Sequence, residues 1–188
     1  MTLFVLIATI LGIIINKGFE GVIKNPIRGF FLAIIGFILQ LAIFNSNFAF
    51  SQYEYLTPYF YVVSLLFLLA FILLNLSYNG MKIILTGFLL NFIAIVANGG
   101  YMPQYVDKLT TAGKLAKIRL LEQYGHFYNG ILGNNQTKFK MLTDVITIDK
   151  PAFLSGVYSI GDLITILGII VFIFEFTKPK RGGRATQN

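Results

Sequence analysis

The sequence contains no cysteine and a single histidine, His126, among its 188 residues. Without cysteine the chain can form no disulfide, no thiolate metal site and no thiol nucleophile. One histidine likewise argues against a histidine-rich metal site. We therefore expect neither a bound metal nor a cofactor, and carboxylates are the best candidates for any chemistry.

Charged residues are also scarce, at 12%, whereas 56% of the residues are hydrophobic and the mean hydropathy is +0.73. The apolar residues come in long blocks, and a helix needs about 20 of them to cross a hydrocarbon core of about 30 Å. Little sequence is left for a separate soluble domain. We predict an all-α integral membrane protein, a single polytopic domain over residues 1–188. Its five predicted transmembrane helices are 2–16, 27–44, 56–76, 83–98 and 157–176.

The net charge of +7 falls mainly where short cytoplasmic connections are expected, which argues against a nucleic-acid partner. Lys17, Lys24 and Arg28, for example, lie between the first two apolar runs. Because short basic connections stay in the cytoplasm, the N-terminus is predicted outside and the C-terminus inside. Residues 99–156 then form a folded extracytoplasmic segment between spans four and five. The basic cytoplasmic tail, 177–188, is expected to contact anionic lipid.

One stretch of the segment 99–156 has helical periodicity. Its apolar residues between 104 and 124 recur at spacings of three and four, which predicts an amphipathic helix. Two placements fit this helix: along the outer membrane surface, or packed over the bundle as a cap. Residues 126–136 are predicted to be a loop, and 139–148 a short strand or a re-entrant piece. The apolar stripe consists of Val106, Leu109, Ala112, Ala116, Leu120 and Tyr124.

The fourth apolar run carries small and amide side chains on one helical face, namely Gly80, Gly87, Asn91, Ala94 and Asn98. Small residues let helices approach closely, and asparagines hydrogen-bond across the contact. We favour a tight helix–helix seam. The alternative is a polar track leading to an outer site, in which Asn91 and Asn98 contact a ligand.

The motif Asn98-Gly99-Gly100-x-Met102-Pro103 closes this run. Paired glycines allow a left-handed helix cap, and a proline prevents the helix from resuming. A helix stop therefore explains the motif. Its backbone amides are also candidates for an anion or oxyanion site, which makes Asn98, Gly99 and Gly100 candidate substrate-binding residues.

Two aspartates, Asp144 and Asp162, frame the start of the last apolar run. In one interpretation they share a proton: one carboxyl acts as an acid, and the other, ionised, activates a water that attacks a carbonyl. In the other interpretation Ser159 is the N-cap of the last helix, Asp162 completes a capping box, and Asp144 is an ordinary loop residue. The chemistry of these residues alone favours the second interpretation.

The surroundings of these aspartates resemble the C-terminal part of lipoprotein signal peptidase (signal peptidase II). The stretches Leu142–Ile146 and Val157–Gly168 are similar to the two motifs in which that family carries its catalytic aspartates. Ser159 stands where the family has an asparagine. The resemblance implies that Asp144 and Asp162 are catalytic, that Ser159 contacts substrate, and that the substrate is a lipid-linked or membrane-embedded peptide.

A second resemblance covers more of the chain, roughly residues 80–168. It is to a family of small bacterial integral membrane proteins of unknown function, and it implies a multi-pass protein of the bacterial cytoplasmic membrane without naming an activity. The residues that carry it are Gly80, Gly87, Asn91, Asn98-Gly99-Gly100-x-Met102-Pro103, Asp144, Pro151 and Ser159-x-Gly161-Asp162.

Three functions are consistent with these features. The first is an intramembrane aspartyl hydrolase that resembles signal peptidase II and acts at the outer leaflet through Asp144 and Asp162. The second is a non-enzymatic carrier or a protein that binds a lipid or another small molecule, with its site along Asn91 and Asn98. The third is a subunit of a larger membrane assembly that has no site of its own. Membrane lipids are expected partners in each case.

Overall fold

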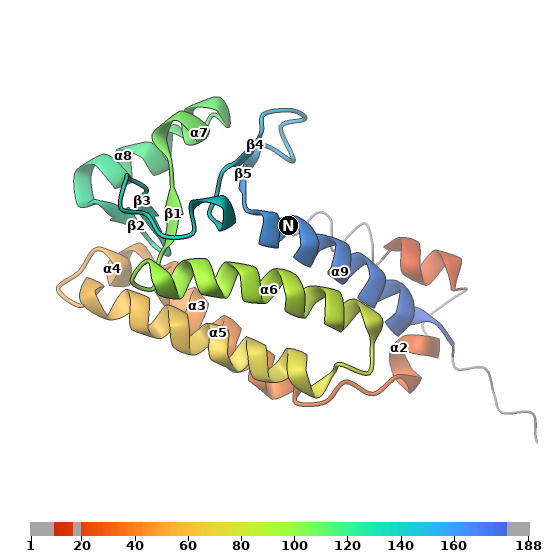
Figure 1. The fold of residues 1–188 in the computed structure, drawn as a ribbon. Coiled ribbons are helices and arrows are strands. Elements are labelled where there is room, and N and C mark those ends of the chain that lie inside the picture. The colour runs from red at the N-terminus through yellow and green to blue at the C-terminus, as the bar shows by residue number, and fades with distance from the viewer. Residues whose placement is uncertain (1–9, 17–19, 180–188) are drawn as a thin grey trace, which may run out of the picture.

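The computed structural model describes residues 10–16 and 20–179, and it shows a bundle of long helices with a smaller α/β segment at one end (Figure 1). The bundle helices are α3 (Phe30–Ile43), α5 (Thr57–Leu74), α6 (Asn79–Ala97) and α9 (Ile160–Thr177). α6 packs along α9, α3 packs along α5, and α5 also contacts α6. Shorter helical pieces are residues 10–15, α2 (Glu20–Lys24), α4 (Ser46–Ala49) and the 3-10 turn η1 (Glu54–Leu56).

Three of the described helical stretches are long and apolar enough to cross a membrane: Glu54–Leu74, Asn79–Ala97 and Ile160–Thr177. The helix α3 is also apolar but has only 14 residues. Many of its large apolar side chains point outward, as expected for a surface that faces lipid; Leu41, for example, is 71% exposed. A mostly helical protein of the membrane type is therefore supported. Five spans are not confirmed, and most of the first predicted span, 2–16, lies outside the described residues.

Polar side chains at the helix ends explain why two helices begin where they do. α3 begins at residue 30 rather than 27, because Asn75 binds the extended backbone ahead of it. The Arg28 N–H donates to Asn75 Oδ1 at 2.9 Å, and Asn75 Nδ2 donates to the Arg28 carbonyl at 2.8 Å. α6 begins earlier than predicted, at residue 79, because the Glu175 carboxylate at the far end of α9 accepts the Gly80 N–H at 2.8 Å. Asn75 thus has a structural role.

The segment 99–156 is not all-α, which corrects the predicted fold class. Its helices are joined by two small sheets, one with strand order β1-β3-β2 and one that pairs β4 with β5 antiparallel. β1 runs parallel to β3, and β2 antiparallel to it. A strand was expected within 139–148, and β4 confirms it for the last three of these residues. The strands are β1 (Met102–Gln104), β2 (His126–Phe127), β3 (Gly130–Leu132), β4 (Ile146–Ile148) and β5 (Gly156–Tyr158), with the 3-10 turn η2 at Lys140–Leu142.

The predicted amphipathic helix over 104–124 is two helices, α7 (Val106–Thr111) and α8 (Leu115–Tyr124). Gly113 breaks it with a positive φ of 69°, and the Lys114 N–H closes the turn on the Leu109 carbonyl at 2.9 Å. The break changes which residues face inward. Of the predicted stripe, Leu109 and Ala112 are buried and Leu120 packs on the same core, whereas the other three residues, Val106, Ala116 and Tyr124, are exposed. In α8 the buried residues are Ile118 and Leu121, which pack with Leu109, Phe127 and Phe50. The two helices therefore pack on the sheet and on the end of the bundle.

Glycines bring α6 and α9 into backbone contact, as the predicted seam requires. A Cβ added at Gly87 would lie 2.5 Å from the Gly161 carbonyl oxygen, and one added at Gly80 would lie 2.2 Å from the Phe172 backbone nitrogen. Neither position could hold a larger residue without moving a helix. Ala94 lies elsewhere: it packs in the core that α6 forms with α3 and α5.

Candidate functional site

A cavity of about 740 Å³ lies between the four bundle helices. Its walls are mainly apolar, with Phe71, Met81 and Phe172 toward the end far from the α/β segment. Its polar lining comes from the helix turns nearest that segment and from the segment itself, so the cavity has one apolar and one polar end. The polar lining residues are Gln40, Tyr61, Asn91, Asn129, Asp144, Asp162 and Thr165.

Asp144 reaches the cavity from the α/β segment. Its backbone forms an isolated parallel bridge with Gln104, and Gln104 Nε2 donates a hydrogen bond to Asp144 Oδ2. The residue is only 6% exposed. Burial, and after it the charge of Asp162, raise the pKa of Asp144 to about 8, against smaller lowering effects of Gln104 and Lys117. Asp144 therefore holds its proton near neutral pH.

Asp162 lies in the first turn of α9 and belongs to a closed set of hydrogen bonds. It forms a capping box with Ser159: Ser159 Oγ accepts the Asp162 N–H at 2.9 Å, and Asp162 Oδ2 accepts the Ser159 N–H at 3.0 Å. Asn91 joins them from α6, donating to Asp162 Oδ1 at 2.8 Å and accepting from Ser159 Oγ at 2.7 Å. The capping interpretation is thus confirmed for Ser159 and Asp162. It is wrong for Asp144, which is no ordinary loop residue.

The charges that line this cavity are of one sign. In the described part of the chain its lining includes two carboxyls and no lysine, arginine or histidine. Lys117 influences Asp144 from α8, but its ammonium lies over the Phe127 ring, 4.7 Å from the centroid, and does not line the cavity. Burial lowers the pKa of Lys117. Within the described residues, no group of three or more acidic or histidine side chains is arranged to hold a metal ion.

The structure brings some of the predicted binding residues to the cavity and not others. Asn91 lines it, and Ser159 lies directly behind the polar end through its bond to Asn91. Asn98 instead holds a loop: it donates to the Lys138 carbonyl and accepts the Lys138 N–H, both at 2.9 Å. Gly99 is exposed with open space around it, whereas Gly100 is buried against Pro58 at the start of α5. Neither glycine lines the cavity.

Several cavity residues were not predicted from the sequence. Tyr61 of α5 is only 8% exposed, and its hydroxyl accepts a hydrogen bond from Asn129 at 3.1 Å. Asn129, which lines the cavity, and Gln104, which binds Asp144, come from strands and turns whose pairing leaves no local sequence signal. Thr165 could have been found, because it lies one helical turn after Asp162 on the same face.

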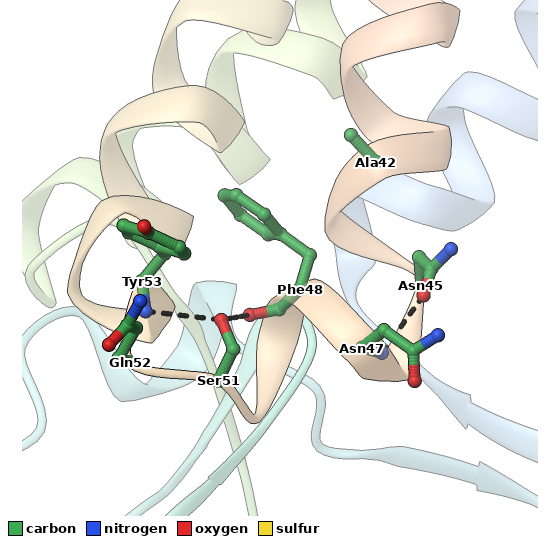
Figure 2. Close-up of a pocket in the computed structure, with 7 residues that line it drawn as sticks. All are labelled: Ala42, Asn45, Asn47, Phe48, Ser51, Gln52 and Tyr53. Atoms are coloured by element: carbon green, nitrogen blue, oxygen red, sulfur yellow. Dashed lines mark hydrogen bonds between the residues drawn. The ribbon is translucent and has the colours of Figure 1, made fainter.

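A second hollow lies on the surface beside α4, and Figure 2 shows the residues that line it. Its polar groups are engaged in local turns: Asn47 N–H donates to Asn45 Oδ1 at 2.9 Å, and Ser51 Oγ donates to the Phe48 carbonyl at 2.9 Å. Ser51 Oγ also accepts the Tyr53 N–H at 3.1 Å. These bonds shape the connection between α3 and α5, so we assign this hollow a structural role.

The fold and the cavity define a class of protein: a helical bundle with helices of membrane-spanning type and an internal cavity that ends at two carboxyls. The chain belongs to the Family of unknown function (DUF5317), whose model matches residues 24–174. It is also 30% identical, over 178 residues, to an uncharacterized protein of Thermotoga maritima, covering 93% of this chain and 89% of that protein. No solved structure matches. Membership of a family of unknown function agrees with the prediction, and the resemblance to signal peptidase II stays a prediction.

Proposed function

We propose that this protein binds an amphiphile, a lipid or a lipid-linked molecule, in the cavity between its four helices. The observation that carries the proposal is the polarity of that cavity, which is apolar along most of its length and polar at the end that holds Asp144 and Asp162. Its volume of about 740 Å³ lies within the usual range of ligand pockets, roughly 300–1,000 Å³. One apolar chain would occupy the helical part, and its polar head would lie at the carboxyls.

The two ends of the cavity would contribute differently to binding. An acyl chain that leaves a bilayer exchanges one apolar environment for another, because lipid tails are as apolar as leucine side chains. Burial of the chain in the cavity therefore adds little net affinity, although the shape of the cavity limits its length. Recognition would come mainly from hydrogen bonds and charge at the polar end.

A cavity-filling substitution tests this proposal. Ala33 lines the cavity from α3 and is 5% exposed, so Ala33→Phe should fill part of the apolar end. Ala42→Phe makes the same change on the exposed face of the same helix and serves as the control. Binding of radiolabelled dodecanol to protein in lipid nanodiscs, with empty nanodiscs subtracted, should fall for the first variant only. Equal binding by both variants and the parent protein would contradict an internal site.

A second candidate function, aspartyl hydrolysis, is supported by the two carboxyls in one cavity. Asp162, ionised, would take a proton from a water whose oxygen attacks a carbonyl carbon, while Asp144 gives its proton to the carbonyl oxygen. When the intermediate breaks down, Asp162 returns its proton to the leaving group and Asp144 recovers its own. Asn91 and the Ser159 N–H hold the Asp162 carboxyl in place by hydrogen bonds, and burial favours the protonated form of Asp144.

Hydrolysis is tested with single-span peptides, acylated and not acylated, reconstituted with the protein in vesicles. Asp144→Asn and Asp162→Asn should each abolish cleavage detected by mass spectrometry, and Asp149→Asn, at an exposed carboxyl, should not. Cleavage that survives either of the first two substitutions would exclude the mechanism. Amphiphile binding would be unaffected by that outcome.

We further infer that the α/β segment and the polar end of the cavity face the outside of a bacterial cytoplasmic membrane, with the C-terminus inside. The distribution of basic residues supports this orientation. The natural absence of cysteine makes the test direct. In intact cells a membrane-impermeant maleimide should label Asn135→Cys, in the segment, but not Ser77→Cys, between α5 and α6. The reverse pattern would invert the topology.

The hypothesis that the chain is a subunit of a larger membrane assembly would be supported by a face of small residues left unpaired within the chain. The glycines of α6 and α9 are used within the chain, where each meets the backbone of the other helix. They therefore do not form an unpaired small-residue face for a second protein.

A further inference from the structure

The polar end of the cavity combines negative charge with unused hydrogen-bond acceptors. Of the two Asp144 oxygens only Oδ2 is hydrogen-bonded within the described residues, to Gln104. Each Asp162 oxygen accepts one hydrogen bond and has a lone pair left for another. A buried polar group without a partner costs stability, so these atoms indicate a place that a ligand completes.

The charge at the polar end of the cavity determines which head groups of an amphiphile it can accept. Two carboxyls line this end, and within the described chain no cation lines the cavity to balance them. Lys117 is held over the Phe127 ring, outside the lining. A phosphate or carboxylate head would therefore enter beside a like charge in a partly apolar cavity, which is strongly unfavourable. An ammonium head has the opposite charge and offers three donors and no acceptor, which matches the free acceptors.

We propose that the amphiphile carries a cationic amine head, which binds between Asp144 and Asp162 with its apolar chain along α3, α5, α6 and α9. This inference rests on the proposed function and specifies its ligand class. The ammonium donates to Asp162 and to the free oxygen of Asp144, which its opposite charge keeps ionised while it is bound. Anionic phospholipids are excluded from the cavity by the same carboxyls.

The experiment compares three probes that share one chain: dodecylamine, dodecanol and dodecyl phosphate. Each competes with radiolabelled dodecanol for the protein in nanodiscs of zwitterionic lipid at neutral pH, and empty nanodiscs correct for partition into the bilayer. A charge-assisted hydrogen bond adds about tenfold in affinity. Dodecylamine should therefore compete at least about tenfold more strongly than dodecanol, and dodecyl phosphate should compete least.

Two variants test whether Asp144 and Asp162 cause the preference for the amine over the alcohol. Asp162→Asn and Asp144→Asn should each reduce the advantage of the amine over the alcohol while leaving dodecanol binding in place, and Asp149→Asn should change neither. Amine and alcohol competing equally, or phosphate competing best, would overturn the amine assignment and leave amphiphile binding standing. Failure of all three probes to bind the parent protein would overturn the proposed function itself, and the amine assignment with it. Competition of the three probes for the parent protein tests the amine assignment even if a variant does not fold.

Discussion

Asp144 should make the stability of this protein fall as pH rises, which is opposite to the effect of a salt-bridged carboxylate. The unfolded chain ionises this carboxyl near its ordinary pKa of 3.8, whereas the folded protein holds the proton up to a pKa of about 8. Between these values the folded state binds one proton more than the unfolded state. The free energy of unfolding must then decrease with pH across this window and level off above it.

The size of the effect follows from the same pKa values. One extra bound proton changes the free energy of unfolding by at most about 1.4 kcal/mol for each pH unit. Between pH 5 and 8 the limit is therefore about 4 kcal/mol, a large share of the stability of a typical domain. Asp144→Asn keeps the shape of the side chain and an acceptor for Gln104 but removes the ionisable group, so this contribution to the slope should disappear.

The assay is denaturant unfolding in mixed micelles at each pH from 5 to 9. The parent protein should lose stability relative to Asp144→Asn as pH rises, so that the variant gains most at pH 8 and above. Asp149→Asn, at an exposed carboxyl, should follow the parent protein. If the parent and Asp144→Asn change in parallel over the whole range, the inference that burial keeps Asp144 protonated is wrong.

Three further predictions concern the packing of the helices and of one loop. Gly87→Ala places a Cβ 2.5 Å from a carbonyl oxygen of α9 and should cost about 1–3 kcal/mol in denaturant unfolding, whereas its exposed neighbour Thr86→Ala should change stability by about 0.5 kcal/mol or less. Glu175→Ala removes the acceptor of the Gly80 N–H in the first turn of α6 and should cost about 1 kcal/mol, with faster amide exchange confined to that helix end; unchanged exchange would contradict its capping role. Asn98→Ala should speed exchange of the Lys138 amide and leave dodecanol binding unchanged; a loss of binding would restore Asn98 as a ligand contact.

The sequence predicted those parts of the fold and site whose cause is local. Long apolar runs predicted the helices, small-residue spacing predicted a tight helix–helix seam on α6 without naming its partner, and the pattern Ser159-x-x-Asp162 predicted the capping box that the structure contains. The break between α7 and α8 was missed, although Gly113 marks it, because the apolar spacing continues across the glycine. The surroundings of Asp144 could not be predicted. They depend on the bridge to Gln104, forty positions earlier in the chain, and such non-local pairing has no periodicity or motif in the sequence.

The two carboxylates at opposite ends of α9 restrict how any molecule could reach the cavity from the side. Asp162 binds Asn91 at one end, Glu175 binds the start of α6 at the other, and glycines keep the two backbones in contact between them. Hydrogen bonds and close packing thus hold α6 and α9 together along their shared length, and the two helices should move as a rigid unit. Lateral passage between them is closed. Among the described helices, α3 and α9 both line the cavity and pack on each other far less extensively than α6 and α9 do.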